Sequence, residues 1–85
     1  MDFYKDFKEK LDSEHQWPTA YMFKFVVPKI KVDEFRTLFF VETLREKISK
    51  AGNYTSFTFK KQIKSSDEVV DIYIKAKKIE GVISL

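Results

Sequence analysis

Apolar residues repeat with two different periods along this chain, and each period predicts one type of element. At the start, Phe3, Phe7 and Leu11 recur every four positions, which is typical of an amphipathic helix over residues 3–14. We expect this helix to end before Trp17-Pro18, because proline disfavours a helical conformation in the residue ahead of it.

Alternation replaces the helical period at Tyr21 and predicts a first strand over residues 21–27. Successive side chains of a strand point to opposite faces, and here every odd-numbered position is apolar. We therefore expect one face of this strand to lie in the core and the other, which carries Lys24, to lie outside it. The core face would consist of Tyr21, Phe23, Phe25 and Val27.

Residues 31–50 fit two interpretations. The apolar positions fit a single long helix that runs as far as Gly52, and periodicity slightly favours that reading. In the alternative, the helix ends near Phe40 and residues 42–49 form a strand. That strand would turn Leu44 and Ile48 inward and Thr43, Arg45 and Lys47 outward.

The last part of the chain predicts a strand, a helix and a short closing strand. Residues 54–64 alternate, and the inner face would consist of Thr55, Phe57, Phe59 and Ile63. Gly52-Asn53 ahead of this strand supplies the positive φ angles of a tight hairpin turn. Ser65 and Glu68 form a capping box for a helix that reaches about Lys78. Its buried stripe would be Val69, Ile72, Tyr73 and Ala76, and residues 82–85 follow Gly81 as the closing strand.

Several segments, in chain order, carry a family resemblance. They are an N-terminal helix leading to Trp17-Pro18-Thr19, the strand 21–27, Ser49-Lys50-x-Gly52-x-Tyr54-x-Ser56, a helix from Ser66, and Ile79-Glu80-Gly81-Val82-Ile83. On these residues the chain resembles the YbeD-like family of uncharacterised small bacterial proteins. The resemblance implies an ACT-like fold, similar to the amino-acid-binding regulatory domains of metabolic enzymes, without an established activity. It also favours the strand over residues 42–49.

The elements then read α-β-α-β-β-α-β, which predicts an α+β protein. We expect a single domain over residues 1–85, with an N-terminal helix and loop (1–18) ahead of a ferredoxin-like βαββαβ core (19–85). The core would be an antiparallel four-stranded sheet with two helices on one face. Right-handed crossovers place the strand 21–27 beside the strand 54–64 in its middle.

Charge is distributed unevenly, although the net charge of the 85 residues is only +3. Residues 42–64 contain six basic side chains against two acidic ones, a net charge of +4, whereas residues 1–41 are neutral and residues 65–85 carry −1. Lysines commonly protect an exposed sheet edge, and an anionic partner is the alternative explanation. No apolar run reaches the roughly 20 residues of a membrane span, so we expect a cytoplasmic protein.

Catalytic chemistry has little support in the composition. The chain has no cysteine and one histidine, His15, which excludes the usual zinc sites. Ser13 and Asp12 lie beside His15, but neighbours in one short segment rarely form a catalytic triad. The acidic pairs Asp33-Glu34 and Asp67-Glu68 fall at predicted helix starts, where acids favour the helix dipole. We expect no enzyme activity, no cofactor and no metal.

The sequence therefore predicts a small binding or regulatory module, which acts through a ligand or a partner protein. The alternative is weak nucleic-acid binding by the basic hairpin face, residues 42–64. A homodimer through the edge strand 82–85 is a further expectation. The candidate binding residues are Lys24, Arg45, Lys47, Lys50, Tyr54, Ser56, Thr58 and Lys60.

Overall fold

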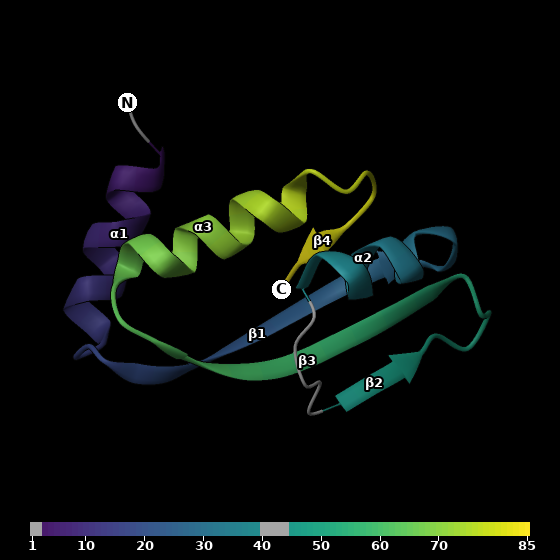
Figure 1. The fold of residues 1–85 in the computed structure, drawn as a ribbon, viewed down its shortest axis with the longest axis horizontal. Helices are drawn as coiled ribbons and strands as arrows, with labels where there is room; N and C mark the ends of the chain where they lie inside the picture. The colour runs from purple at the N-terminus through teal and green to yellow at the C-terminus, as the bar shows by residue number, and fades with distance from the viewer. Residues whose placement is uncertain (1–2, 40–44) are drawn as a thin grey trace.

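The structure, a computed structural model, describes residues 3–39 and 45–85. Its elements are α1 (Phe3–Glu14), β1 (Thr19–Pro28), the 3-10 helix η1 (Lys29–Lys31), α2 (Val32–Phe39), β2 (Arg45–Ile48), β3 (Tyr54–Ile63), α3 (Ser66–Lys77) and β4 (Ile83–Ser84). The strands form one antiparallel sheet in the order β2-β3-β1-β4 (Figure 1). The chain is thus an α+β protein, and β1 lies beside β3 in the middle of the sheet, as predicted.

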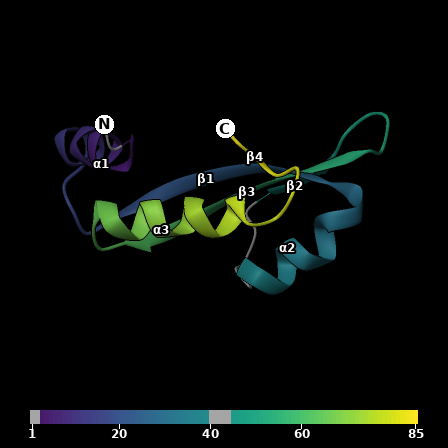
Figure 2. The ribbon, with the colours of Figure 1, turned by 90° about the horizontal axis from the view of Figure 1, so that it is seen from above.

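The helices are arranged so that one sheet face is covered. Helices α2 and α3 lie on the same side of the sheet, and α1 lies at the end where β1 begins (Figure 2). Helix α1 packs on α3 through Phe7, whose ring centroid is 5.6 Å from that of Tyr73, and through an ion pair of 2.6 Å between Lys8 and Asp67. Leu11 of α1 is buried in the same core as the sheet residues.

The core contains most of the odd-numbered side chains of the two central strands, packed against buried residues of α1, α2 and α3. Phe23, Phe25 and Phe59 are fully buried, and the register sets Phe23 opposite Phe59 and Phe25 opposite Phe57. Paired residues of neighbouring strands share a face, so these rings form one layer. The predicted inner faces of both strands are therefore confirmed.

Residues 45–48 form a strand, which decides between the two interpretations of residues 31–50 over the part that the structure describes. The predictions for Leu44 and Thr43 concern residues outside the described ranges. Arg45 and Lys47 are turned outward as predicted, because they pair with Thr58 and Ser56. Ile48 also faces inward as predicted, because it pairs with the buried Thr55. It is nevertheless 66% exposed, since β2 is the outermost strand and has a neighbour on one side only.

Two local predictions need correction. Gly52 has a positive φ of +76°, as predicted for the hairpin. The tight turn itself is centred one step earlier, on Lys50-Ala51, because the N–H of Gly52 donates to the carbonyl of Ser49 and the N–H of Ser49 donates to the carbonyl of Tyr54. Ser65 does precede α3, but its side chain makes no capping hydrogen bond. Instead, the Glu68 N–H donates to the backbone carbonyl of Ser65 at 3.1 Å.

Candidate functional site

The sheet face opposite α2 and α3, called the open face below, brings most of the predicted binding residues together. The register places Lys24 of β1 opposite Thr58 of β3, and Thr58 opposite Arg45 of β2. In the next row Val26 lies opposite Ser56, and Ser56 opposite Lys47. Neighbouring strands are about 4.8 Å apart, so these side chains form one continuous surface.

The remaining predicted residues lie at the ends of this surface. Lys60 is paired with Met22, and Tyr54, which is 45% exposed, is paired with Pro28. Lys50 is exposed but lies in the hairpin loop rather than on the strands. The eight predicted residues therefore divide into seven on the open face and one at its rim.

The open face carries cations without acids. Lys24, Arg45, Lys47 and Lys60 are all exposed, and none of them takes part in an ion pair between described residues. No outward position of the four described strands is occupied by Asp or Glu. Glu46, the acidic residue of β2, faces the other way and pairs with Arg36 of α2. Below, these four cations are called the basic strip.

An apolar strip adjoins the basic strip, and sequence reasoning missed it. Its residues are Met22, Val26, Ile83 and Leu85. Ile83 pairs with Val26, and the N–H of Leu85 donates to the carbonyl of Lys24 at 2.9 Å. Met22 and Val26 were placed on the outer face by alternation alone, but their neighbours on β4 follow only from the strand order. The open face is thus apolar on the β1–β4 side and cationic towards β2.

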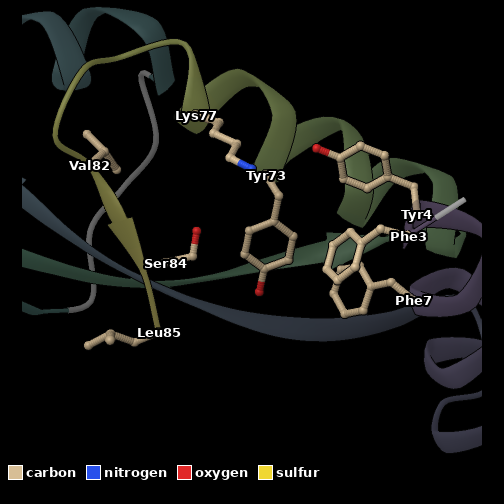
Figure 3. Close-up of a pocket in the computed structure, with 8 residues that line it drawn as sticks. All are labelled: Phe3, Tyr4, Phe7, Tyr73, Lys77, Val82, Ser84 and Leu85. Atoms are coloured by element: carbon tan, nitrogen blue, oxygen red, sulfur yellow. The ribbon is translucent and has the colours of Figure 1, made fainter.

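A concave feature lies between α1, α3 and β4, and it meets the open face at Leu85 (Figure 3). Its volume is about 400 Å³, and its lining residues are Phe3, Tyr4, Phe7, Tyr73, Lys77, Val82, Ser84 and Leu85. We call it the groove. The sequence offered a weak signal for it, because Phe3 and Phe7 extend the apolar stripe of α1 beyond Leu11, the buried residue of that helix.

Tyr73 forms the link between the groove and the core. Its ring centroid lies 5.6 Å from that of Phe23 and 5.8 Å from that of Phe25, and its hydroxyl is 3.4 Å from the hydroxyl of Tyr21. Burial, reinforced by the hydrogen bond with Tyr21, raises the pKa of the Tyr73 hydroxyl well above its usual range. The phenol therefore stays neutral in the folded protein.

This raised pKa predicts a loss of stability at alkaline pH. The contribution of neutral Tyr73 is fully present below about pH 10, where the unfolded chain ionises, and is lost as pH rises through the higher folded-state pKa. We expect the free energy of unfolding in urea to fall more steeply above pH 10 for the wild type than for Tyr73→Phe. Equal slopes for the wild type and Tyr73→Phe would contradict the assignment.

The residues considered for catalysis are engaged elsewhere. The hydroxyl of Ser13 donates to the carbonyl of Lys10 at 2.7 Å, and Asp12 accepts from the indole N–H of Trp17 at 2.8 Å. His15 packs between the rings of Trp17 and Tyr21. Both acidic pairs lie in the first turn of a helix, as predicted.

Three further observations bear on function. Within residues 3–39 and 45–85, no three acidic or histidine side chains are grouped so as to hold a metal ion. None of the helices in this part of the chain has the length and apolarity to cross a bilayer. Comparisons with protein-family models, curated proteins and solved structures find no significant match to this chain.

Proposed function

We propose that this protein is a small non-catalytic binding or regulatory module, which recognises an acidic partner protein through its open face. The observation that carries the proposal is the segregation of charge: four exposed cations share a face from which the described strands exclude carboxylates. Cations at diagonal positions of neighbouring strands repel one another. An anionic partner relieves this repulsion.

The apolar strip favours a protein partner over a bare polyanion. Met22 and Ile83 are each 53% exposed, and they lie next to Lys24 rather than on a separate surface. Protein interfaces combine an apolar centre with charged positions around it, whereas a phosphate backbone offers no apolar counterpart. The partner we propose therefore presents acidic side chains beside an apolar ridge.

The fold we propose is ferredoxin-like, in keeping with the family resemblance. The chain passes from β1 through α2 to β2, leaving room for β3 between them, and from β3 through α3 to β4, with β1 between. Two such interleaved βαβ units are the pattern of that fold. A likeness to ACT-like regulatory domains is an analogy of fold, and by itself it names no ligand.

The proposal is tested by reversing charge on the basic strip. Lys47→Glu combined with Lys60→Glu should lower the affinity for the partner about tenfold or more, because like charges then face each other across the interface. The measurement is quantitative capture from native extract at low salt, with the captured proteins identified by mass. Lys75→Glu with Lys78→Glu makes the same change of charge on the other side of the molecule and should retain the partner. If the strip variant captures what the wild type captures, the proposal fails.

Weak nucleic-acid binding through the same strip is the second candidate, because Tyr54 adds an exposed ring to the cations. One ring supports little base stacking, so affinity would come mainly from phosphates. Four phosphate contacts predict a log–log salt slope of about −3 for a single strand. Fluorescence anisotropy with single-stranded RNA and DNA measures it. Met22→Ser separates the candidates, since it should weaken a protein partner and leave nucleic-acid binding unchanged.

A further inference from the structure

The groove has the size of a small-molecule site. Its volume of about 400 Å³ falls within the roughly 300–1,000 Å³ of typical ligand pockets. One wall is a row of rings: Phe3 stacks on Phe7 with centroids 6.1 Å apart, and Phe7 contacts Tyr73 at 5.6 Å. Tyr73, at one end of this wall, packs against Phe23 in the core, and its hydroxyl lies 3.4 Å from that of Tyr21.

Exposed apolar side chains stand at both ends of the groove. Phe3 is 72% exposed on α1, and Leu85 is 67% exposed beyond β4. Val82 adds a further apolar side chain next to β4 (Figure 3). A ligand with an apolar body would remove these surfaces from water, which is the favourable direction of the hydrophobic effect.

Among the described residues, one charged side chain lies on this apolar lining. It belongs to Lys77, in the last turn of α3, which forms no ion pair with the other described residues. Ser84 supplies a hydroxyl on the β4 side. A cation at the rim of an aromatic wall is complementary to an anion with an apolar body, whose charged end meets Lys77 while its body covers the rings of Phe7 and Tyr73.

We propose that the groove binds a small monocarboxylate with an aromatic or aliphatic body. The carboxylate accepts hydrogen bonds from the Lys77 ammonium, and the body lies against the ring wall of α1 and Tyr73. The site is separate from the basic strip, so this inference does not rest on the proposed function.

The test uses a matched pair of probes, 3-phenylpropionate and 3-phenylpropan-1-ol, which differ in charge but share an apolar body. Each probe is titrated into the full chain and followed by the amide signals of Lys77, Ser84 and Leu85 in nuclear magnetic resonance spectra. We expect both probes to shift these signals. The carboxylate should bind about three- to fivefold more tightly than the alcohol, because a partly exposed ion pair adds an increase in affinity of about this size.

Two variants and one control separate the charged and apolar contributions. Lys77→Met should abolish the preference for the carboxylate while leaving the alcohol bound, and Lys75→Met, which alters a lysine outside the groove lining, should leave both affinities unchanged. Phe3→Ala should weaken both probes, and its high exposure lets the fold persist, which an unchanged Tm verifies.

Several results would overturn the inference. They are the absence of shifts in the groove at the solubility limit of both probes, equal affinity of the wild type for the two probes, and an undiminished preference in Lys77→Met. Shifts of the same signals on dilution of the protein alone would show instead that a second copy occupies the groove, and would equally count against it.

Discussion

Phe25→Ala is expected to cost about 3–5 kcal/mol of folding free energy, the range found for truncation of a buried phenylalanine. Its side chain is fully buried at the centre of the core. Its ring lies within 6.2 Å of five others, measured between centroids: Phe23, Phe35, Phe39, Phe59 and Tyr73. Those neighbours come from β1, α2, β3 and α3, so the layers around the cavity cannot close by moving one element.

The expected loss is a large fraction of the total folding free energy of a domain of this size. Small domains have about 5–15 kcal/mol of stability, and short chains bury a smaller fraction of their surface. Urea unfolding followed by circular dichroism measures the change. Phe3→Ala is the matched control, because the same truncation at a ring that is 72% exposed should cost below about 1 kcal/mol. A cost under about 1.5 kcal/mol for Phe25→Ala would contradict this account of the core.

The same ring layer explains why the central strands could be predicted from the sequence. A strand buried on one face must alternate, and the alternating phenylalanines of β1 and β3 leave one register in which all four rings meet. Phe23 lies opposite Phe59 and Phe25 opposite Phe57, as that pattern requires. Here local preference and tertiary packing favour the same structure.

Strand β2 could not be predicted in this way, because it is four residues long and none of its side chains is buried. Its Glu46 lies on the inner face of the sheet, where the pattern would call for an apolar residue. Pairing with Arg36 of α2 satisfies that carboxylate, and the guanidinium lies 5.8 Å from the centroid of Phe57. The inner face of β2 is thus held by an ion pair with α2 and not by buried apolar side chains. The sequence of β2 therefore lacks the apolar alternation from which a strand is predicted.

The residues of the candidate site divide in the same way: local alternation predicts some of them, and only long-range packing brings the others together. Alternation identified the outward Lys24, since parity within a strand is a local property. The outward direction of Arg45 and Lys47 followed only once the family resemblance favoured a strand over residues 42–49. The apolar strip and the groove combine residues that are far apart in the chain, such as Phe3 with Leu85. Neither could be found without the order of the strands and the packing of α1 on α3. The sequence alone showed an excess of basic side chains in residues 42–64. Only the pairing of the strands showed that these cations lie together on the open face.

Gly81→Ala is expected to destabilise the protein by about 2–3 kcal/mol, because it combines two costs. Gly81 has a φ of +85°, a left-handed conformation that L side chains rarely adopt. In addition, a Cβ at this position would lie 2.8 Å from Cγ of Pro28, so the proline ring or the chain must move. Gly81 comes two residues before β4, which would be displaced from the edge of β1.

Gly52→Ala is the control that separates the two costs. Gly52 has a similar φ of +76°, but a Cβ there would meet nothing within 4 Å. It should cost about 1 kcal/mol, the conformational part alone, and urea unfolding of both variants gives the difference. Hydrogen exchange locates the damage, because the amide of Leu85 donates to Lys24 and should lose protection in Gly81→Ala only. Equal losses of stability in the two variants would mean that the Pro28 ring can move aside without destabilising the protein. They would also mean that β4 does not depend on the close contact between Gly81 and Pro28.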